Sequence, residues 1–308
     1  MKKKIILFIL GPTCVGKTNL SIYLAKKFKT EILSIDSRQF YKELKIGTSM
    51  PDEKALNTVP HHFIGHLHFY QNYNAKLFET DFLKKTSKLF HKYSILIAVG
   101  GSSLYEKSIT EGLCHIPDID PKIHNELIVH YKKKGIQYLQ KEFLNIKNQN
   151  DVMDIHNPRR LIRYIEIFKS TGKTPLFFWK KNKKKRNFIT LKVGLFLPKN
   201  EIFNRIHIRV NSMIKKGLLH EAKKFYPYKN LNSLQTIGYK EIYSFLEKKE
   251  KICIKNVIKN IEINTRKYVK KQITWYKKYQ DITWFDPKNQ VDILNFISRK
   301  WAILDLNQ

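Results

Sequence analysis

The most specific chemical signal in the sequence is the segment GPTCVGKT at residues 11–18, which directly follows the apolar run Ile5–Leu10. Its spacing, G-x-x-x-x-G-K-[ST], is that of a loop whose backbone N–H groups turn inward around a phosphate chain. The lysine supplies charge to the same oxygens, and the final hydroxyl is a ligand for Mg²⁺. We therefore predict a phosphate-binding loop, called the phosphate loop below, formed by Gly11, Pro12, Thr13, Cys14, Val15, Gly16, Lys17 and Thr18.

Asp36 ends a second apolar segment, EILSID, and is followed by Ser37, Arg38 and Gln39. In a parallel α/β sheet the carboxyl ends of neighbouring strands face one crevice, so we expect Asp36 near the phosphate loop. Two chemical roles suit a carboxylate there: a metal-binding acid, as in ATP-hydrolysing P-loop proteins, and a general base beside a substrate. An aspartate that only caps a turn is the third interpretation.

A third apolar segment, SILIAVGG, ends in a Gly-Gly turn that delivers Ser102 and Ser103 to the same edge. Such glycines permit close approach by a ligand, although a plain strand-to-helix turn has the same residues. A kinase would favour a carboxylate at the end of this strand, and the sequence has none there. The loop alone therefore leaves open whether its phosphates are those of ATP or of another diphosphate.

Arginines occur in clusters at helical spacing. Arg159, Arg160 and Arg163 begin at a predicted helix N-terminus, which itself attracts anions, and guanidinium groups bind phosphate oxygens in pairs. The cluster suits an RNA backbone, and the alternative is a solvated basic face paired with Glu166. Arg205 and Arg209 form an i,i+4 pair. The two arginines could together bind a diphosphate; that they only form an exposed helix face is an equally good interpretation.

Other polar segments are less specific. TRKYVKKQITWYKK, residues 265–278, interleaves basic residues with Tyr268, Trp275 and Tyr276, a pattern that suits RNA unless the aromatic residues belong to the core. His61 and His62 are adjacent, but no acid or cysteine stands at ligand spacing, so the sequence does not favour a metal site.

Bulk composition indicates a polyanionic partner. The 308 residues include 58 Lys and Arg against 26 Asp and Glu, a formal net charge of +32. This excess favours nucleic acid, because each neutralised phosphate releases counterions; a lysine-rich codon bias is the alternative. Cys14, Cys114 and Cys253 are far apart, which fits a reducing cytoplasm without a zinc site. No run approaches the roughly 18 apolar residues of a transmembrane helix.

Alternating apolar runs and helical patterns predict an α/β fold: a P-loop NTPase-like parallel sheet core with helices on both faces, plus an inserted helical domain. The expected strands are Ile5–Leu10, Glu31–Asp36, Ser94–Gly101 and Phe188–Leu197. The expected helices include Lys17–Phe28, one capped by Asn74, one from Pro158 with Asn157 as cap and Gly172 as stop, and one from about Cys253 to Tyr279. A change to polar, lysine-rich helical sequence, including the run Lys180–Arg186, places the core at 1–116 and 188–308 and the insert at 117–187.

Taken in order, these motifs resemble one family, the bacterial tRNA dimethylallyltransferases, also called isopentenyl-tRNA transferases. The resemblance covers nearly the whole chain and rests on GPTCVGKT, SIDSRQFYKELKIGTSMP, PHHFIG, YNAKLFETDF, AVGGSSLYEKSITEGL, NPRRLIRYIEIF, LQTIGYKE and TRKYVKKQITW. It implies transfer of a dimethylallyl group from dimethylallyl diphosphate to N6 of the adenine 3′ of the tRNA anticodon, giving N6-isopentenyladenosine and diphosphate. Mg²⁺ is the implied cofactor, and no ATP is hydrolysed.

The resemblance also implies roles for matching residues. The phosphate loop would cradle the diphosphate with Thr13 at its mouth, Lys17 and Arg209 would help to hold it, and Asp36 would be the general base on the adenine amine. Ser102 stands where the family often has threonine, and Cys14-Val15 departs from the small residues often found in the loop. The implied tRNA contacts are Asp36, Ser37, Arg38, Gln39 and Ser102 and, in the insert, Arg159, Arg160, Leu161, Ile162 and Arg163.

The implied partners are the tRNA anticodon stem-loop and dimethylallyl diphosphate, for a cytoplasmic, monomeric enzyme without a membrane attachment. Two other function classes remain compatible with the residues. One is a P-loop small-molecule or nucleoside kinase, which would transfer labelled phosphate from ATP. The other is a non-enzymatic RNA-binding protein that uses the loop as a phosphate clamp, in which Asp36→Ala would have little effect.

Overall fold

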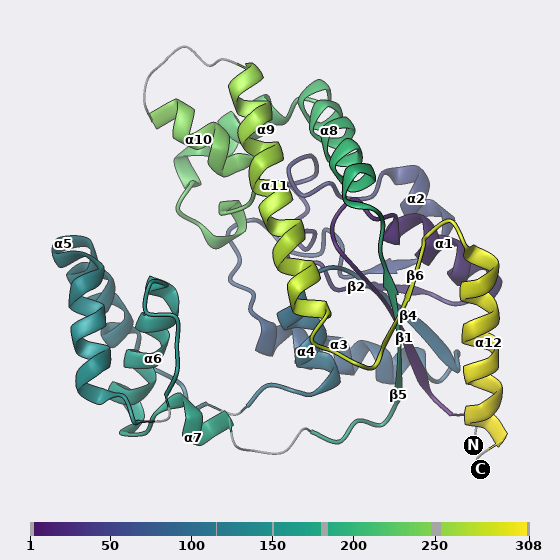
Figure 1. Cartoon of the computed structure of the whole chain (residues 1–308), viewed down its shortest axis with the longest axis horizontal. Coiled ribbons are helices and arrows are strands. Elements are labelled where there is room, and N and C mark those ends of the chain that lie inside the picture. Colours follow the sequence, from purple (N-terminus) through teal and green to yellow (C-terminus); the bar gives the residue numbers. More distant parts are fainter. Residues whose placement is uncertain (1–2, 115, 150, 180–183, 248–253, 307–308) are drawn as a thin grey trace. The chain divides into compact units, whose positions relative to one another are not determined.

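The computed structural model describes residues 3–114, 116–149, 151–179, 184–247 and 254–306. The chain forms two compact units: a core unit, Met1–Thr110 with Lys185–Gln308, and an insert unit, Glu111–Lys184. Figure 1 shows both units in sequence colours. The change to polar, lysine-rich sequence predicted the limits of the insert at 117 and 187. Residues 180–183 of the lysine run lie outside the described residues.

The core unit contains a six-stranded parallel sheet in the order β3-β2-β4-β1-β5-β6. Its strands are β1 (Ile5–Leu10), β2 (Ile32–Ser34), β3 (His61–His62), β4 (Ile95–Val99), β5 (Ile189–Leu195) and β6 (Ile282–Phe285). The four strands expected from the sequence are present: β1 has the expected bounds, and β2, β4 and β5 are somewhat shorter than expected. The edge strands β3 and β6 were not predicted.

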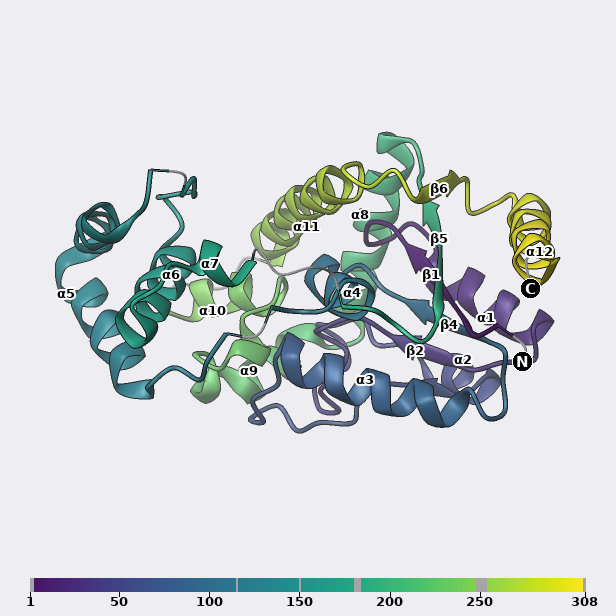
Figure 2. The same ribbon diagram turned by 90° about the horizontal axis from the view of Figure 1, so that it is seen from below.

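Strand β1 lies at the centre of the sheet, between β4 and β5. Every residue from Ile5 to Leu10 is fully buried. Because successive side chains on a strand point to opposite faces, this burial requires cover on both faces. Helices flank the sheet of the core unit in this way in Figure 2. The predicted P-loop-type parallel core with helices on both faces is therefore confirmed.

The core unit also holds most of the described helices. They are α1 (Lys17–Lys27), α2 (Glu53–Thr58), α3 (Ala75–Leu89), α4 (Ser103–Thr110), α8 (Lys199–Lys215), α9 (Leu218–Phe225), α10 (Tyr239–Glu247), α11 (Ile254–Tyr276) and α12 (Gln290–Leu306), with short 3₁₀ turns at Tyr226–Tyr228 and Asn232–Leu234. The predicted Asn74 cap is confirmed, since its side chain accepts hydrogen bonds from the N–H groups of Lys76 and Leu77. The predicted long helix is α11, and Cys253 lies outside the described residues.

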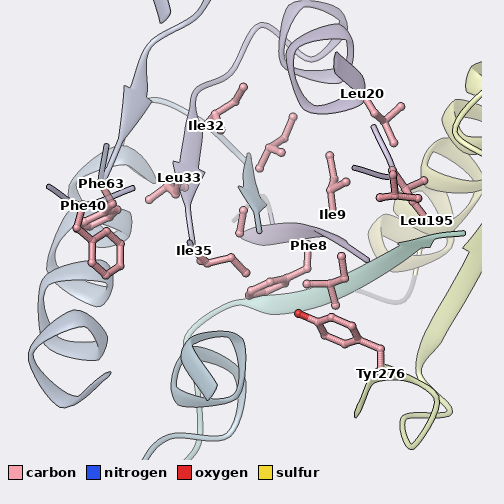
Figure 3. Packing of buried hydrophobic residues seen from close by; sticks show 14 of the residues in the cluster. Phe8, Ile9, Leu20, Ile32, Leu33, Ile35, Phe40, Phe63, Leu195 and Tyr276 are labelled. Carbon is pink, nitrogen blue, oxygen red and sulfur yellow. The ribbon is translucent and has the colours of Figure 1, made fainter. Parts of the chain in front are cut away.

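Buried apolar side chains fix the segment that follows β2. Ile35 and Phe40 are both fully buried, and the Phe40 ring stacks on Phe78 of α3 with 5.3 Å between centroids. Figure 3 shows Phe40 and Phe63 gathered beside β2, with Phe8 and Ile9 on the central strand. The intervening residues 36–39 are thus anchored at both ends, while their own side chains stay partly exposed.

The insert unit is helical and has its own core. It consists of α5 (Pro121–Ile146), which breaks its helical geometry at Gly135, α6 (Pro158–Thr171) and α7 (Pro175–Trp179). Its apolar cluster includes Leu127, Leu139, Phe143, Leu161 and Ile165. The predicted start and stop of α6 are confirmed: Asn157 caps it, Pro158 is its first residue, and Gly172 follows with φ 65°.

Membrane-spanning helices are absent from the described part of the chain, because none of its helices combines the necessary length with sufficient apolarity.

Candidate active site

The phosphate loop joins β1 to α1 at the carboxyl edge of the sheet. Gly11 and Gly16 have φ values of 140° and 108°, which favour glycine, and a Cβ at Gly11 would lie 2.7 Å from the carbonyl oxygen of Leu195. Gly16 is also the N-cap of α1 and provides no side-chain cap. The first N–H groups of α1 are therefore left for an anion, which the helix dipole also favours.

Lys17 lies inside this loop. Its Nζ donates hydrogen bonds to the carbonyl oxygens of Gly11 at 2.9 Å and Pro12 at 2.7 Å. The pKa of Lys17 is lowered to about 8, chiefly because the ammonium is buried; the carboxylate of Asp36 opposes this shift, and the charge of Arg209 adds to it. A bound anion would favour the charged ammonium in the same way as Asp36 does.

Arg209 and Arg205 reach the phosphate loop from α8. The Nε of Arg209 donates to Ser49 Oγ at 2.8 Å, and its Nη1 donates to Thr13 Oγ1 at 2.9 Å. Arg205 instead pairs with Glu201 at 2.8 Å and donates a long hydrogen bond of 3.4 Å to the carbonyl oxygen of Val15. Arg209 is thus aimed at the mouth of the loop, whereas Arg205 braces its backbone.

Asp36 and Ser102 follow the neighbouring strands β2 and β4. The N–H of Arg38 donates to Asp36 Oδ1 at 3.0 Å, which fixes the carboxylate. The N–H of Ser37 donates to Ser102 Oγ at 3.2 Å, so the two strand ends are tied together. Because β1, β4 and β2 are adjacent and parallel, these residues share one sheet edge with the phosphate loop.

The next two residues are held in different ways. Arg38 extends across the core unit, where its Nη1 donates to the carbonyl oxygen of Asn232 at 2.6 Å. Gln39 turns inward, and its Nε2 donates to the carbonyl oxygen of Ser49 at 3.1 Å. Arg38 therefore ties the residues after β2 to the 3₁₀ turn at Asn232–Leu234, and Gln39 ties them to the loop around Ser49.

Gln272 is a site residue that sequence reasoning missed. It is almost fully buried on α11, accepts a 3.0 Å hydrogen bond from the N–H of Thr13 and donates one of 2.9 Å to the carbonyl oxygen of Gly101. A Cβ at Gly101 would lie only 2.3 Å from Gln272 Nε2, so this approach requires glycine. One amide therefore connects the phosphate loop to the turn after β4. The only sequence signal for it was its membership in the motif TRKYVKKQITW.

Glu221 of α9 was missed as well. Its carboxylate accepts hydrogen bonds from the N–H groups of Lys45, Ile46 and Gly47 at 2.8–3.1 Å and from the hydroxyl of Tyr239 at 2.7 Å. This acid fixes the turn that leads to Ser49, the partner of Arg209. No local sequence pattern predicts it, because its partners lie far away along the chain.

In the insert unit the arginine cluster is divided by its contacts. Arg159, Arg160 and Arg163 are all exposed, but Arg163 also donates from Nη1 to Glu166 at 2.8 Å. The side chains of Leu161 and Ile162 lie in the core of the unit, with 0 % and 4 % exposed. This corrects the expected tRNA contacts: apolar side chains on the inner face of α6 do not reach an RNA, so side-chain contacts from this segment must come from its arginines.

The remaining candidate segments are also clarified. Tyr276 is fully buried and belongs to the core, whereas Tyr268 keeps 40 % of its surface exposed. Desolvation and the nearby Asp36 carboxylate together raise the pKa of Tyr268 to about 12. His62 pairs with Glu31 at 2.6 Å. Within the described residues no group of three or more His, Cys, Asp or Glu side chains could hold a metal ion.

A sequence model of the IPP transferase family matches residues 39–279. The chain belongs to this family. Among relatives in the IPP transferase family, the tRNA dimethylallyltransferase of Christiangramia forsetii is 43 % identical over 294 residues, covering 95 % of this chain and 97 % of the relative. That of Flavobacterium psychrophilum is 41 % identical over 288 residues, covering 91 % and 93 %. The family resemblance read from the motifs is confirmed.

Solved structures of the IPP transferase family have the same architecture. The full-length tRNA isopentenylpyrophosphate transferase from Bacillus halodurans superposes with a TM-score of 0.71 at 30 % identity, covering 98 % of this chain and 97 % of that one. A eukaryotic dimethylallyltransferase described as acting on tRNA superposes with a TM-score of 0.74 at 25 % identity, covering 96 % and 80 %.

Proposed function

We propose that this member of the IPP transferase family is a tRNA dimethylallyltransferase that alkylates N6 of the adenine 3′ of the anticodon. Dimethylallyl diphosphate is the donor, and the products are N6-isopentenyladenosine and diphosphate. The observation that carries the proposal is the pairing of a phosphate loop with Asp36 at one sheet edge. The two are close enough that the Asp36 carboxylate influences the pKa of Lys17.

In the proposed reaction, N6 of the adenine attacks C1 of the dimethylallyl group as the bond between C1 and the diphosphate oxygen breaks. The electron pair of that bond leaves with the diphosphate. The carboxylate of Asp36, held by the N–H of Arg38, orients the exocyclic amine and accepts its proton. Ser102, tied to Ser37, adds a hydroxyl at the same strand ends.

The phosphate loop binds and stabilises the leaving group, the diphosphate. The N–H groups at the start of α1, the ammonium of Lys17 and the guanidinium of Arg209 all converge on this loop. Donors that are already in place stabilise developing negative charge without reorganisation, and this is usually the largest contribution to catalysis. The same donors fit a diphosphate held without hydrolysis of ATP.

Mg²⁺ fits these residues as a partner of the substrate. Thr18 is exposed at the start of α1, and the described residues offer no cluster of acidic or histidine ligands that would form a separate metal cage. Mg²⁺ commonly takes one or two protein ligands and completes its shell with phosphates and water. Thr18 would supply the protein oxygen, and the bound ion would neutralise charge on the diphosphate.

The exposed basic residues are proposed to bind the RNA. A paired or stacked adenine cannot reach a cleft at a sheet edge, so we expect the target base to be flipped out of the anticodon loop. The net charge of +32 suits the phosphate backbone of the tRNA, with Arg159 and Arg160 as exposed contacts in the insert unit. We expect the enzyme to act as a monomer in the cytoplasm.

The test offers the purified protein radiolabelled dimethylallyl diphosphate or γ-labelled ATP, with Mg²⁺, in the presence and in the absence of unmodified tRNA. The proposal expects the dimethylallyl label to enter tRNA and the ATP label to enter nothing. Transfer of phosphate without prenylated tRNA would establish a kinase, and RNA binding without any transfer would establish a binding protein. Either result contradicts the proposal.

A further inference from the structure

A cavity of about 240 Å³ lies in the core unit outside the residues assigned to the reaction. We infer that it binds a second, unpaired base of the substrate RNA, next to the base that reacts. This inference rests on the proposed function for the identity of the RNA. Its walls come from the segment between β3 and α3 and from the 3₁₀ turn at Asn232–Leu234, and Tyr41 also lines it. We call it the aromatic-amide pocket.

The aromatic part of the pocket suits stacking. Tyr41, Phe69, Tyr70 and Tyr73 line it, and Tyr70 stacks on His68 with 5.2 Å between centroids while 59 % of its surface remains exposed. A tyrosine supported on one face and open on the other is a platform for a planar ring. Unpaired RNA bases are commonly held by stacking on such side chains.

The amide part suits the edge of a base. Gln71, Asn72 and Asn232 are lining residues with exposed carboxamides. Gln71 uses its carbonyl oxygen to accept a hydrogen bond from the N–H of His68, which leaves its NH₂ group as a donor. Carboxamides offer a donor and an acceptor side by side, the pattern that matches base edges.

The lining side chains favour a neutral occupant over a phosphate. None of the described residues that line the pocket is charged, although the chain as a whole carries a net charge of +32. The volume is also below the approximately 300–1,000 Å³ of pockets for drug-sized ligands. A neutral, planar ligand with hydrogen-bonding edges, such as a nucleobase, fits both facts.

Arg38 connects the pocket to the candidate active site. Its backbone N–H donates to Asp36 Oδ1, and its Nη1 donates to the carbonyl oxygen of Asn232 on the pocket wall. Asp36, Ser102 and the phosphate loop are not among the lining residues. The pocket therefore takes a base other than the one that faces Asp36, and their closeness favours a neighbour on the same strand.

The test is a double-mutant cycle between the protein and the RNA. Anticodon stem-loop RNAs, each with one abasic nucleotide beside the target adenosine, are titrated by fluorescence anisotropy against the wild-type protein and Tyr70→Ala. One abasic RNA should bind the wild type about 5- to 100-fold more weakly, the range expected for one stacked base. Tyr70→Ala should lose a similar factor on the complete RNA and almost nothing more on that abasic RNA.

Two further variants sharpen the result. Gln71→Glu removes the NH₂ donor at nearly constant size and should reduce discrimination among the four bases at the same RNA position. Trp301→Ala is the matched control, because Trp301 lines a different cavity with Phe28 and Tyr93 and should leave RNA binding unchanged. Thermal melting verifies that each variant is folded.

Unchanged binding of the complete RNA by Tyr70→Ala, or an equal loss on every RNA, overturns the pocket assignment. Prenyl transfer by the wild-type protein is measured on the same RNAs, so the two proposals fail separately. Prenyl transfer without an energetic coupling between Tyr70 and the neighbouring base contradicts only the proposal that the pocket binds a base. Coupling without transfer contradicts the proposed function and leaves the pocket as part of an RNA-binding surface.

Discussion

The positive charges of the core unit and of the insert unit are held in different ways. In the core unit, Lys17 donates to two loop carbonyls, and Arg209 is fixed by hydrogen bonds to Ser49 and Thr13. In the insert unit, Arg159 and Arg160 extend into solvent from the first turn of α6. Charges of one sign thus occur in a hydrogen-bonded, partly buried arrangement and in an exposed, hydrated one.

The difference separates chemistry from attachment. Desolvated donors in fixed positions act strongly on charge that develops during a reaction, because little reorganisation is needed. Exposed charges are screened by salt and contribute mainly to the affinity for a polyanion. Changes to the fixed charges of the phosphate loop should therefore alter the rate of transfer, and changes to exposed arginines of the insert should alter RNA affinity.

The largest effect should follow from Asp36→Asn, which keeps the shape of the side chain and removes the proton acceptor. We expect the single-turnover rate of transfer to fall about 10²- to 10⁴-fold, while RNA affinity stays within about twofold of the wild type. Asp292→Asn, an exposed aspartate of α12, is the control and should react normally. A nearly normal rate in Asp36→Asn would show that the acceptor lies elsewhere.

Lys17→Met should have the next largest effect. Loss of one fixed donor to the leaving group is expected to lower kcat/KM for the donor about 10²- to 10³-fold. The salt dependence of RNA binding should not change, because Lys17 lies in the loop and not on the RNA surface. Lys26→Met removes an exposed lysine from the same helix and serves as the control. A reduced salt slope in Lys17→Met would show that Lys17 contributes to RNA binding, and so would contradict its assignment to the reaction alone.

Donor binding should depend on pH through Lys17. The ammonium in the free site has its pKa lowered to about 8, so it is charged below that pH and neutral above it. Affinity for dimethylallyl diphosphate should therefore be level just below pH 8 and fall up to about tenfold per pH unit above it. Calorimetry should also detect proton uptake on binding near pH 8. Lys17→Arg stays charged, so the fall in donor affinity above pH 8 should disappear. If the pH profile is unchanged in that variant, the fall belongs to another group.

Gln272→Met tests the bridge between the phosphate loop and the turn after β4. The substitution keeps the bulk but leaves the N–H of Thr13 and the carbonyl oxygen of Gly101 without their amide partner. We expect a loss of about 1–3 kcal/mol in the free energy of unfolding, measured with urea. As a positioning effect, the KM for the donor should rise and RNA affinity should not change. Normal stability with a normal KM would mean that the bridge is dispensable.

The smallest effect on transfer should come from the double variant Arg159→Ala/Arg160→Ala. RNA affinity should fall, and the slope of log affinity against log salt should decrease by about one for each arginine that contacts a phosphate. The transfer rate at saturating RNA should stay normal. Arg163→Ala should change less, because Glu166 already neutralises that guanidinium, and Arg299→Ala on α12 is an exposed control. An unchanged salt slope in the double variant would show that these arginines of the insert unit do not contact the RNA backbone.

Features with a local cause could be predicted from the sequence. The phosphate loop depends on glycines and a lysine at fixed spacing, and the caps Asn74 and Asn157 act on N–H groups only a few residues away. The central strands follow from apolar runs that are buried on both faces. These signals are complete within a short window of sequence, so the fold class followed from them.

Features with a distant cause could not be predicted in this way. Gln272 meets Thr13 across 259 positions, and Glu221 meets Gly47 across 174. Strand β3 has only two residues and gives no alternating pattern of its own. Leu161 and Ile162 were expected in a tRNA-contact segment because of the family resemblance, although helical periodicity turns them inward to the core of the insert unit.

The most direct test of the central claim is mass spectrometry of nucleosides from the tRNA of cells that lack this protein, complemented with the wild type or with Asp36→Asn. We expect isopentenyladenosine and its derivatives to disappear in the deletion, to return with the wild type and to stay absent or nearly absent with Asp36→Asn. An unchanged content of these nucleosides in the deletion, or their full restoration by Asp36→Asn, would contradict the claim.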